Sequence, residues 1–177
     1  HSHYSLLEAL PKIPKLVKAA KDTGMTALAL TDSGNLYGAI EFYKECHEQG
    51  IKPIIGVDFY IAARTREDKE ARIDNERSRL ILLAENLEGY HNLLKLVTYS
   101  YLEGFYYKPR IDRELLEKYR EGLIAIAKEE KYYREIFSNK FYLEKELAIY
   151  NVCYLKPEDR PAFNTVLSIQ EHLSRGA

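Results

Sequence analysis

The sequence is poor in cysteine and has no excess of either charge. Only Cys46 and Cys153 occur among 177 residues, and they form no CxxC pair, so a disulfide framework is excluded. Lys and Arg number 26 against 27 Asp and Glu, giving a net charge of -1. A free-standing nucleic-acid binder usually carries a clear positive excess. We therefore expect a reducing, cytoplasmic setting and only local contact with any nucleic acid.

Long hydrophobic runs and the common nucleotide or nucleophile motifs are also missing. No stretch approaches the roughly 20 apolar residues that a membrane-spanning helix needs, and no basic-then-apolar leader is present. No Walker loop, GxSxG elbow or GxGxxG fingerprint occurs. We expect a soluble protein without a membrane partner. Because the sequence begins with His1 instead of Met, we also expect it to be an excerpt of a longer protein.

What the sequence does have is an alternation of helical patterns and short apolar runs. Apolar residues make up 46% of the chain, enough for one sizeable core, and we expect a single domain over residues 1–177. The alternation predicts a parallel α/β sheet or barrel. The expected strands are Ala27 to Thr31, Lys52 to Ala62, Leu80 to Ala84, Gly122 to Ala127, Phe141 to Leu143 and Ala148 to Tyr154. A first helix is expected to start at Ile13, and a second to carry Leu36, Ile40, Tyr43 and His47 on one face. Four more helices are expected at Tyr90 to Tyr101, Asp112 to Tyr119, Lys128 to Phe137 and Pro157 to Leu173.

Two segments read as connections instead of regular structure. The stretch from Arg64 to Arg79 is highly charged with mixed signs and lacks an apolar stripe, which is typical of an exposed or frayed loop. The stretch from Gly104 to Arg110 is an aromatic-rich loop, in which Pro109 excludes a helix. The tyrosines of the whole chain are scattered, so we expect half-buried core edges in place of a stacking platform.

Candidate chemistry lies where the expected strands end, because ligands gather at the carboxyl ends of parallel strands. Asp32 and Ser33 follow the first strand, and Asp32 either binds a ligand or accepts N–H groups of the next turn. Cys153 near the last strand is either a small buried hydrophobe or a ligand. The His1 and His3 pair has the spacing of a metal site, but spacing alone favours a terminal or engineered origin over a metal role. The remaining polar candidates are Asn35 after the first strand, Asp58 within the second and Asn151 near the last.

Three stretches together resemble a known family. They are HSHYSLLEA, ALALTDSGNLYGAIEFYKECHEQGIKPIIGVDFYIA and LLAENLEGYHNLLKLVTYSYLEGFYYKPRIDRELLEKYREGLIAIA. They resemble the polymerase and histidinol phosphatase (PHP) domain, in the form that opens the alpha subunit of bacterial DNA polymerase III. The resemblance runs through residues 1–127 and resumes in NVCYLKPEDRPAFNTVLSIQ, at residues 151–170, as the closing segment.

The resemblance implies a distorted seven-stranded β/α barrel whose strand ends, in active members, hold a cluster of metal ions. Those ions, zinc or manganese, serve phosphoester hydrolysis, and in the polymerase setting this is 3′-to-5′ proofreading. Cations acidify a bridging water and neutralise the phosphate. A magnesium-dependent palm domain would lie outside this chain.

At the family's ligand positions this sequence departs from the pattern. His1 matches the second His of the family's His-x-His-Ser opening, so His3 occupies a variable position. Glu8, Asp58 and Cys153 replace an Asp, a Glu and a His, and with His1 they form the tentative metal set. Three positions read as vacated, because hydroxyl, guanidinium and amide groups are poor ligands for such metals: Ser33, Arg79 and Asn151.

The chain is also shorter than the resemblance implies. Between Ala127 and Asn151 the family has a cysteine-bearing loop, further helices and at least one more strand. We expect either an incomplete barrel or omitted residues, at the Ala127-Lys128 or Leu147-Ala148 junction. Residues 128–150 would then be a shortened segment of one PHP domain.

The resemblance leaves two functions open. In the first, the barrel has a degenerate metal site and serves as scaffold and docking surface in a replicative DNA polymerase, with DNA, other replisome subunits and a proofreading exonuclease subunit as partners. In the second, it is a metal-dependent phosphoesterase with 3′-to-5′ exonuclease activity. A free-standing histidinol-phosphatase relative is disfavoured, because GFYYKPRID resembles the polymerase branch.

Overall fold

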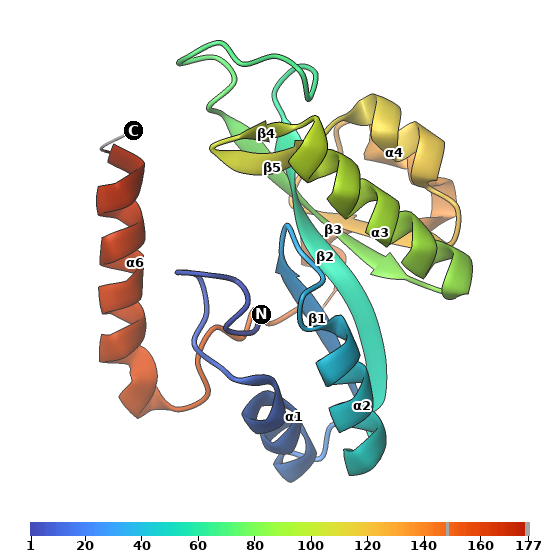
Figure 1. Cartoon of the computed structure of the whole chain (residues 1–177). Coiled ribbons are helices and arrows are strands. Elements are labelled where there is room, and N and C mark those ends of the chain that lie inside the picture. Colours follow the sequence, from blue (N-terminus) through green and yellow to red (C-terminus); the bar gives the residue numbers. More distant parts are fainter. Residues whose placement is uncertain (148, 176–177) are drawn as a thin grey trace. The chain divides into compact units, whose positions relative to one another are not determined.

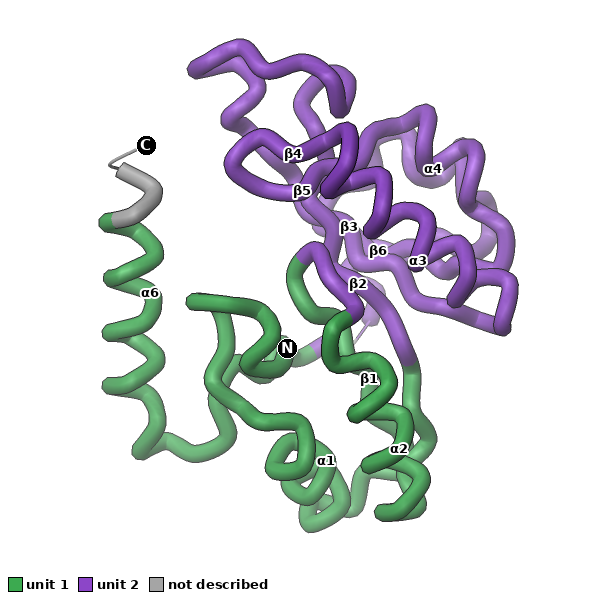
Figure 2. The backbone as a smooth tube through the Cα atoms, in the orientation of Figure 1, with its two compact units in different colours: residues 1–33, 37–54, 150–177 green, residues 34–36, 55–149 purple. Residues whose placement is uncertain are grey.

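A computed structural model describes residues 1–147 and 149–175 (Figure 1). The chain divides into two compact units (Figure 2). Unit 1 comprises residues 1–33, 37–54 and 150–177, and unit 2 comprises residues 34–36 and 55–149. The expected junction at Leu147-Ala148 involves Ala148, which lies outside the described residues.

Unit 1 contains α1, β1, α2 and α6. Helix α1 (Ile13–Asp22) has the apolar spacing predicted for it and packs on α2 (Ala39–Gln49). Strand β1 (Ala27–Ser33) pairs with β2, and beside it the Lys52 N–H donates to the Thr26 carbonyl. A 3-10 turn (η3, Pro157–Asp159) leads into α6 (Arg160–Arg175), so the last helix is confirmed.

The predicted apolar face of α2 is wrong. Ile40 and Tyr43 are 57% and 48% exposed, while Phe42 and Cys46 are fully buried. Both stripes have helical spacing, so the sequence pattern alone does not rank them. The buried stripe consists of Ala39, Phe42 and Cys46. The small side chain of Ala39 suits close packing, so this stripe faces the core.

Unit 2 is built on a mixed sheet with the order β4-β5-β2-β3-β6-β7. Pairs β2–β3 and β3–β6 are antiparallel, whereas β2–β5 and β6–β7 are parallel, so the prediction of a parallel sheet is wrong at its centre. No helix crosses over between β2 and β3, as a parallel return would require. Within the described residues the sheet does not close into a barrel. The strands of the sheet are β2 (Lys52–Ala62), β3 (Arg77–Ala84), β4 (Phe105–Tyr106), β5 (Lys108–Ile111), β6 (Leu123–Ala127) and β7 (Phe141–Leu143). The helices of unit 2 are α3 (Leu87–Leu102), α4 (Arg113–Tyr119) and α5 (Tyr133–Phe137), with the 3-10 turns η1 (Ser138–Lys140) and η2 (Glu144–Glu146).

The core of unit 2 lies on one face of this sheet. Val57, Phe59 and Ile61 alternate along β2 and are almost completely buried with Leu80 and Leu82 of β3. Residues of α3, α4 and α5 complete the cluster. Because strand side chains alternate between faces, the even-numbered residues of β2 project from the other face.

The charged segment between β2 and β3 is mostly exposed and irregular, as predicted, except that its last residues, 77–79, belong to β3. Buried polar contacts hold it in place. The Arg110 side chain is fully buried and donates to the carbonyl oxygens of Gly104 (3.0 Å), Arg66 (2.9 Å), Asp68 (2.9 Å) and Asp74 (3.3 Å). Asp74 is itself 0% exposed. One buried guanidinium therefore satisfies backbone groups that would otherwise lack partners.

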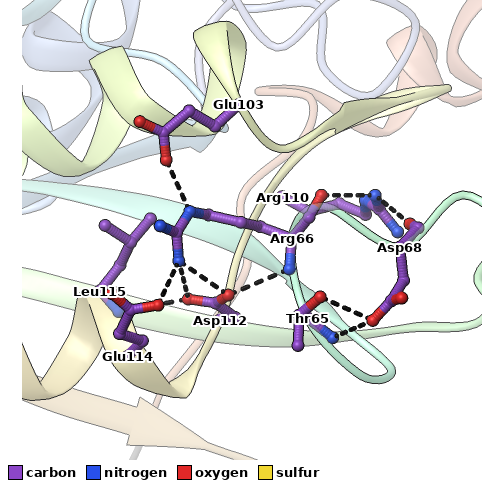
Figure 3. A network of polar contacts seen from close by, with 8 residues as sticks. All are labelled: Thr65, Arg66, Asp68, Glu103, Arg110, Asp112, Glu114 and Leu115. Carbon is purple, nitrogen blue, oxygen red and sulfur yellow. Dashed lines mark hydrogen bonds and ion pairs between the residues drawn. The ribbon is translucent and has the colours of Figure 1, made fainter.

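A second arginine fastens this segment to α4. Arg66 Nη1 lies 3.0 Å from an Asp112 oxygen and 3.0 Å from a Glu114 oxygen, and its Nε donates to Glu103 (Figure 3). Asp112 also accepts from the Leu115 N–H, which confirms it as the N-cap of α4. The loop and the helix start thus share one carboxylate.

Three further predictions changed in the structure. Phe105 to Ile111 form a tight hairpin, β4–β5, where a loop was expected. Residues 149–154 form no strand, so Cys153 is not in one, and Ala148 of that prediction lies outside the described residues. The expected helix from Lys128 shrinks to α5. Strand β7 and the other strands were placed correctly, to within a few residues.

Candidate functional site

The carboxylate of Asp32, at the end of β1, is held by the N-terminal segment. Its oxygens accept from the Ser2 N–H at 2.6 Å, the Ser2 hydroxyl at 2.7 Å and the Ser5 hydroxyl at 2.7 Å. Asp32 is 1% exposed, and both serines are buried with it. Asp32 was expected either to bind a ligand or to accept hydrogen bonds from the turn that follows it. The contacts fit a structural role, but the donors are Ser2 and Ser5, so Asp32 anchors the start of the chain.

Ser33 joins this cluster to Glu8. The Ser33 hydroxyl donates to one Glu8 oxygen at 2.5 Å, and the Gln170 amide of α6 donates to the other at 3.2 Å. The Ser33 N–H donates to the Ser5 hydroxyl at 3.0 Å. Both oxygens of Glu8, a tentative metal ligand, thus accept hydrogen bonds from neutral groups.

The other tentative ligands of unit 1, His1 and Cys153, each contact residues of the N-terminal segment. The His1 ring contacts the Ser5 hydroxyl through Nδ1 at 3.3 Å, and the Cys153 carbonyl accepts from the Leu10 N–H. Burial raises the pKa of the Cys153 thiol; the Glu8 carboxylate adds to this and the His1 amino group opposes it. The vacated position Asn151 is exposed. A thiol with a raised pKa is a weaker source of the thiolate that zinc binds.

In unit 2 the tentative ligand Asp58 is paired with Arg79. The guanidinium of Arg79 donates from Nε to Asp58 Oδ1 at 2.9 Å and from Nη2 to Oδ2 at 2.7 Å. Asp58 is 8% exposed, and it lies on the sheet face opposite the core. This two-pronged contact is the geometry in which arginine binds carboxylates best.

The guanidinium of Arg79 also stacks on the ring of Tyr60. The guanidinium carbon of Arg79 lies 4.2 Å from the Tyr60 ring centre, and Lys108 Nζ lies 5.3 Å from it. Tyr60 and Arg79 are partners in the β2–β3 register, so the stacking follows from the strand pairing. The turn after β1 packs against the same ring: a Cβ on Gly34 (φ +66) would lie 3.5 Å from Tyr60 and 2.9 Å from Pro109.

Comparison with protein families decides the identity of the fold. The PHP domain family matches residues 1–134 of the chain. The chain belongs to the PHP domain family. This PHP chain is similar to proteins named DNA polymerase III subunit alpha. The protein from Borreliella burgdorferi is 47% identical over 165 residues, which cover 81% of this chain and 14% of the relative.

Two more relatives carry the same name. The Chlamydia pneumoniae protein is 51% identical over 131 residues, covering 72% of this chain and 10% of the relative. The Aquifex aeolicus protein is 37% identical over 221 aligned residues, covering 96% of this chain and 19% of the relative. That alignment is longer than the 177-residue chain, so the relative has residues that this chain lacks. The chain therefore spans a fifth or less of the length of these relatives.

Two solved structures resemble parts of the chain. One is described as a metal-dependent phosphoesterase from Bifidobacterium adolescentis, with a TM-score of 0.39, 13% identity and coverage of 52% of this chain and 29% of that chain. The other is an amidohydrolase from Chromobacterium violaceum with bound sulfate and no metal, with a TM-score of 0.38, 16% identity and coverage of 51% and 28%.

The described carboxylates at the tentative metal positions are engaged with other partners. Among the described residues no group of three or more His, Cys, Asp and Glu side chains is gathered as a metal would need. Asp58 binds a guanidinium, Glu8 binds Ser33 and Gln170, and Asp32 binds two serines. Displacing these partners would subtract from any affinity for a metal.

Sequence reasoning missed the residues that complete these networks. Ser5 and Gln170 were not singled out, yet they donate to Asp32 and Glu8. The spacing of Ser2 and Ser5 is a helix-cap-like pattern that signals local hydrogen bonding, but nothing in it points to Asp32, 30 positions away from Ser2.

None of the described helices has the length and apolar character of a membrane span.

Proposed function

We propose that this chain is the PHP domain of a bacterial replicative DNA polymerase, equivalent to the N-terminal domain of a DNA polymerase III alpha subunit. We further propose that its metal site is degenerate and that the domain serves as a scaffold and docking module. The identity to three alpha subunits, between 37% and 51%, supports the first part. We take residues 1–177 as one PHP domain with a shortened segment at 128–150.

The ion pair between Arg79 and Asp58 carries the second part. Arginine cannot act as a ligand at neutral pH, because its guanidinium keeps its proton and has no free lone pair. Here it also fills both oxygens of the carboxylate that would be asked to bind the metal. A second cation beside it would meet repulsion in place of a ligand. Ser33 likewise offers a hydroxyl that is committed to Glu8.

A second candidate is a metal-dependent phosphoesterase with 3′-to-5′ proofreading exonuclease activity. It is favoured by one observation: the His1 amino group donates to the Val152 carbonyl at 3.4 Å, which brings the start of the chain next to Cys153. The metal set would be His1, Glu8, Asp58 and Cys153, with zinc or manganese as the cofactor. The polymerase reaction and its magnesium would lie in a palm domain beyond this chain.

Partners follow from the first proposal. The scaffold would contact other replisome subunits, including a proofreading exonuclease subunit, and would meet DNA through the longer polymerase. The setting would be the cytoplasm. A near-neutral charge suits such a role, because a scaffold needs no overall positive field.

Metal analysis separates the two functions. The 177-residue chain, purified without a histidine tag, is titrated with Zn²⁺ and Mn²⁺ and its metal content is measured by plasma mass spectrometry. We expect no stoichiometric metal and no manganese-dependent degradation of DNA 3′ ends. Stoichiometric metal together with exonuclease activity that His1→Ala abolishes would overturn the scaffold proposal. Lys15→Ala, on an exposed residue of α1, is the matched control.

A further inference from the structure

The β4–β5 hairpin places aromatic rings at the end of the sheet of unit 2. Phe105 is 49% exposed and Tyr107 is 47% exposed. Tyr101, the second-last residue of α3, is 38% exposed, and its ring stacks on that of Phe105 with centres 6.3 Å apart. Strand β4 is the last strand in the sheet order (Figure 1). The hairpin and the adjoining end of α3 thus carry one exposed stacked pair, Tyr101 and Phe105, and a third exposed ring, Tyr107, at the turn.

Tyr107 is held in a backbone conformation that disfavours a large side chain. It is the single residue between the paired Tyr106 and Lys108, and its φ is +58°. Glycine or asparagine adopts this left-handed region readily, whereas a tyrosine is strained there. Such strain is common where a side chain is positioned for binding. In this conformation the Tyr107 ring packs edge-on against that of Tyr106, with ring centres 4.6 Å apart, and remains 47% exposed at the turn.

The hairpin beneath these rings is rigid. The Arg110 Nε donates to the Gly104 carbonyl, and its guanidinium lies 5.2 Å from the Tyr106 ring centre. The Arg77 Nη1 donates to the Tyr106 carbonyl at 3.2 Å. A preorganised aromatic surface loses little entropy on binding, so these clamps favour recognition over simple packing.

Arg77 also connects the hairpin to a charged groove. It lines a cavity of about 300 Å³ with Lys128 and Lys131, and an adjoining one of about 470 Å³ with Lys131 and Glu76. Glu129 lines both. Arg79 also lines the first cavity, so four cations face two carboxylates. Because Arg79 is already paired with Asp58, the groove suits one or two phosphate groups and no long phosphate tract.

We propose that this surface binds single-stranded nucleic acid. We name it the hairpin surface and define it as Tyr101, Phe105 and Tyr107 with the groove at Arg77, Lys128 and Lys131. Bases stack on the rings, and the phosphates beside them enter the groove. Aromatic rings next to cations are the usual platform for unpaired bases, while a duplex keeps its bases stacked internally. The proposal goes beyond the scaffold role and needs no metal.

Fluorescence anisotropy tests the hairpin surface directly. The 177-residue chain is titrated into a labelled single-stranded oligothymidine and into a duplex of equal length, at about 50 mM salt and above. We expect tighter binding of the single strand. With two phosphates bound, the logarithm of the association constant should fall with the logarithm of salt with a slope of about -1.4.

Variants assign the binding to the rings. Phe105→Ala and Tyr107→Asn should each weaken single-strand binding at least about fivefold. Asparagine suits the left-handed backbone at position 107, so Tyr107→Asn removes the ring while keeping the turn. Tyr43→Ala is the matched control, because Tyr43 is equally exposed, on α2 of unit 1, and should bind as the parent chain does. Thermal unfolding checks that each variant folds.

The charged groove has its own pair of variants. Lys128→Ala should weaken binding and lower the salt slope by about 0.7, whereas Lys15→Ala on α1 should change neither. Equal affinity for duplex and single strand would overturn the proposal. So would an unchanged affinity in Phe105→Ala, or competition by inorganic phosphate that removes all binding, since that would indicate a phosphate site alone. Arg79 also lines the groove, but none of these variants changes it, so the results do not bear on the Asp58–Arg79 pair that carries the scaffold role.

Discussion

Two buried carboxylates, Asp32 in unit 1 and Asp58 in unit 2, are neutralised in different ways. Asp32 accepts from a backbone N–H and two serine hydroxyls, all of them neutral donors. Asp58 instead takes both hydrogen bonds of one guanidinium. The comparison teaches that a buried aspartate in this fold can be satisfied either by neutral donors or by a cation. Of the partners described for these two carboxylates, Arg79 is the one whose charge opposes a metal.

The largest effect is expected from Asp32→Ala. It would leave the hydroxyls of Ser2 and Ser5 and one N–H without their acceptor, all in a buried region. We expect a loss of about 3 kcal/mol in the free energy of unfolding, measured by urea denaturation. Asp32→Asn, which keeps one acceptor oxygen, should lose less. A loss under about 0.5 kcal/mol in the alanine variant would show that these contacts do not anchor the chain start.

Arg79→Gln comes next. It leaves the carboxylate of Asp58 buried without its cation, and we expect a loss of about 2 kcal/mol, reduced because the Arg79 side chain is 34% exposed. Adding Asp58→Asn should restore more than half of the loss, because both charges are then gone. A double-mutant cycle in urea measures this coupling. Additive effects would mean that the pair does not neutralise Asp58, and the contrast with Asp32 would fail.

Ser33→Ala should have a smaller effect. It removes the hydroxyl that donates to Glu8, while the Ser33 N–H still donates to Ser5. We expect a loss of about 1 kcal/mol, because Gln170 still donates to the other Glu8 oxygen. Thermal or urea unfolding gives the value. Ser33→Thr, which keeps the hydroxyl, is the control, and equal losses in both variants would place the effect on packing.

The smallest effect concerns Cys153 in unit 1. Burial and then the Glu8 carboxylate raise the pKa of this thiol, so little thiolate forms at neutral pH and alkylation by iodoacetamide should be slow. Glu8→Gln removes a negative charge, which lowers that pKa and should speed alkylation by under about threefold. Cys46, fully buried and with a pKa raised to about 11, should stay unreactive and serves as the internal reference. A slower reaction in Glu8→Gln would contradict the assigned cause.

Much of the fold could be predicted because its signals are local. The spacing of Ile13, Leu16 and Val17 predicts α1, and Asp112 predicts the start of α4 through its side chain. The direction of β3 could not be predicted, since an apolar run reads the same in parallel and antiparallel sheets. The exposed stripe of α2 misled for a similar reason: two apolar stripes share one helix. The hairpin at Tyr107 was missed because a tyrosine is not a turn residue.

The candidate site was predicted only in part for a related reason. Family resemblance pointed to Asp58, Glu8, Ser33 and Cys153, but the resemblance says nothing of what these side chains contact here. That Arg79 reaches Asp58 depends on the antiparallel β2–β3 register, in which Arg79 faces Tyr60 and lies diagonal to Asp58. The metal roles of His1, Glu8, Asp58 and Cys153 stay a prediction.

By itself the sequence determined the helices, most strands, the family and the replacement of imidazole by hydroxyl and guanidinium at two positions, because these depend on residue type and short spacing. Tertiary structure alone decided which groups those replacements bind. Ser2 reaches Asp32 across 30 positions, and Arg110 gathers carbonyls up to 44 positions away. Such contacts are set by how strands pair and pack, and no local pattern encodes the distance between residues that far apart in the chain.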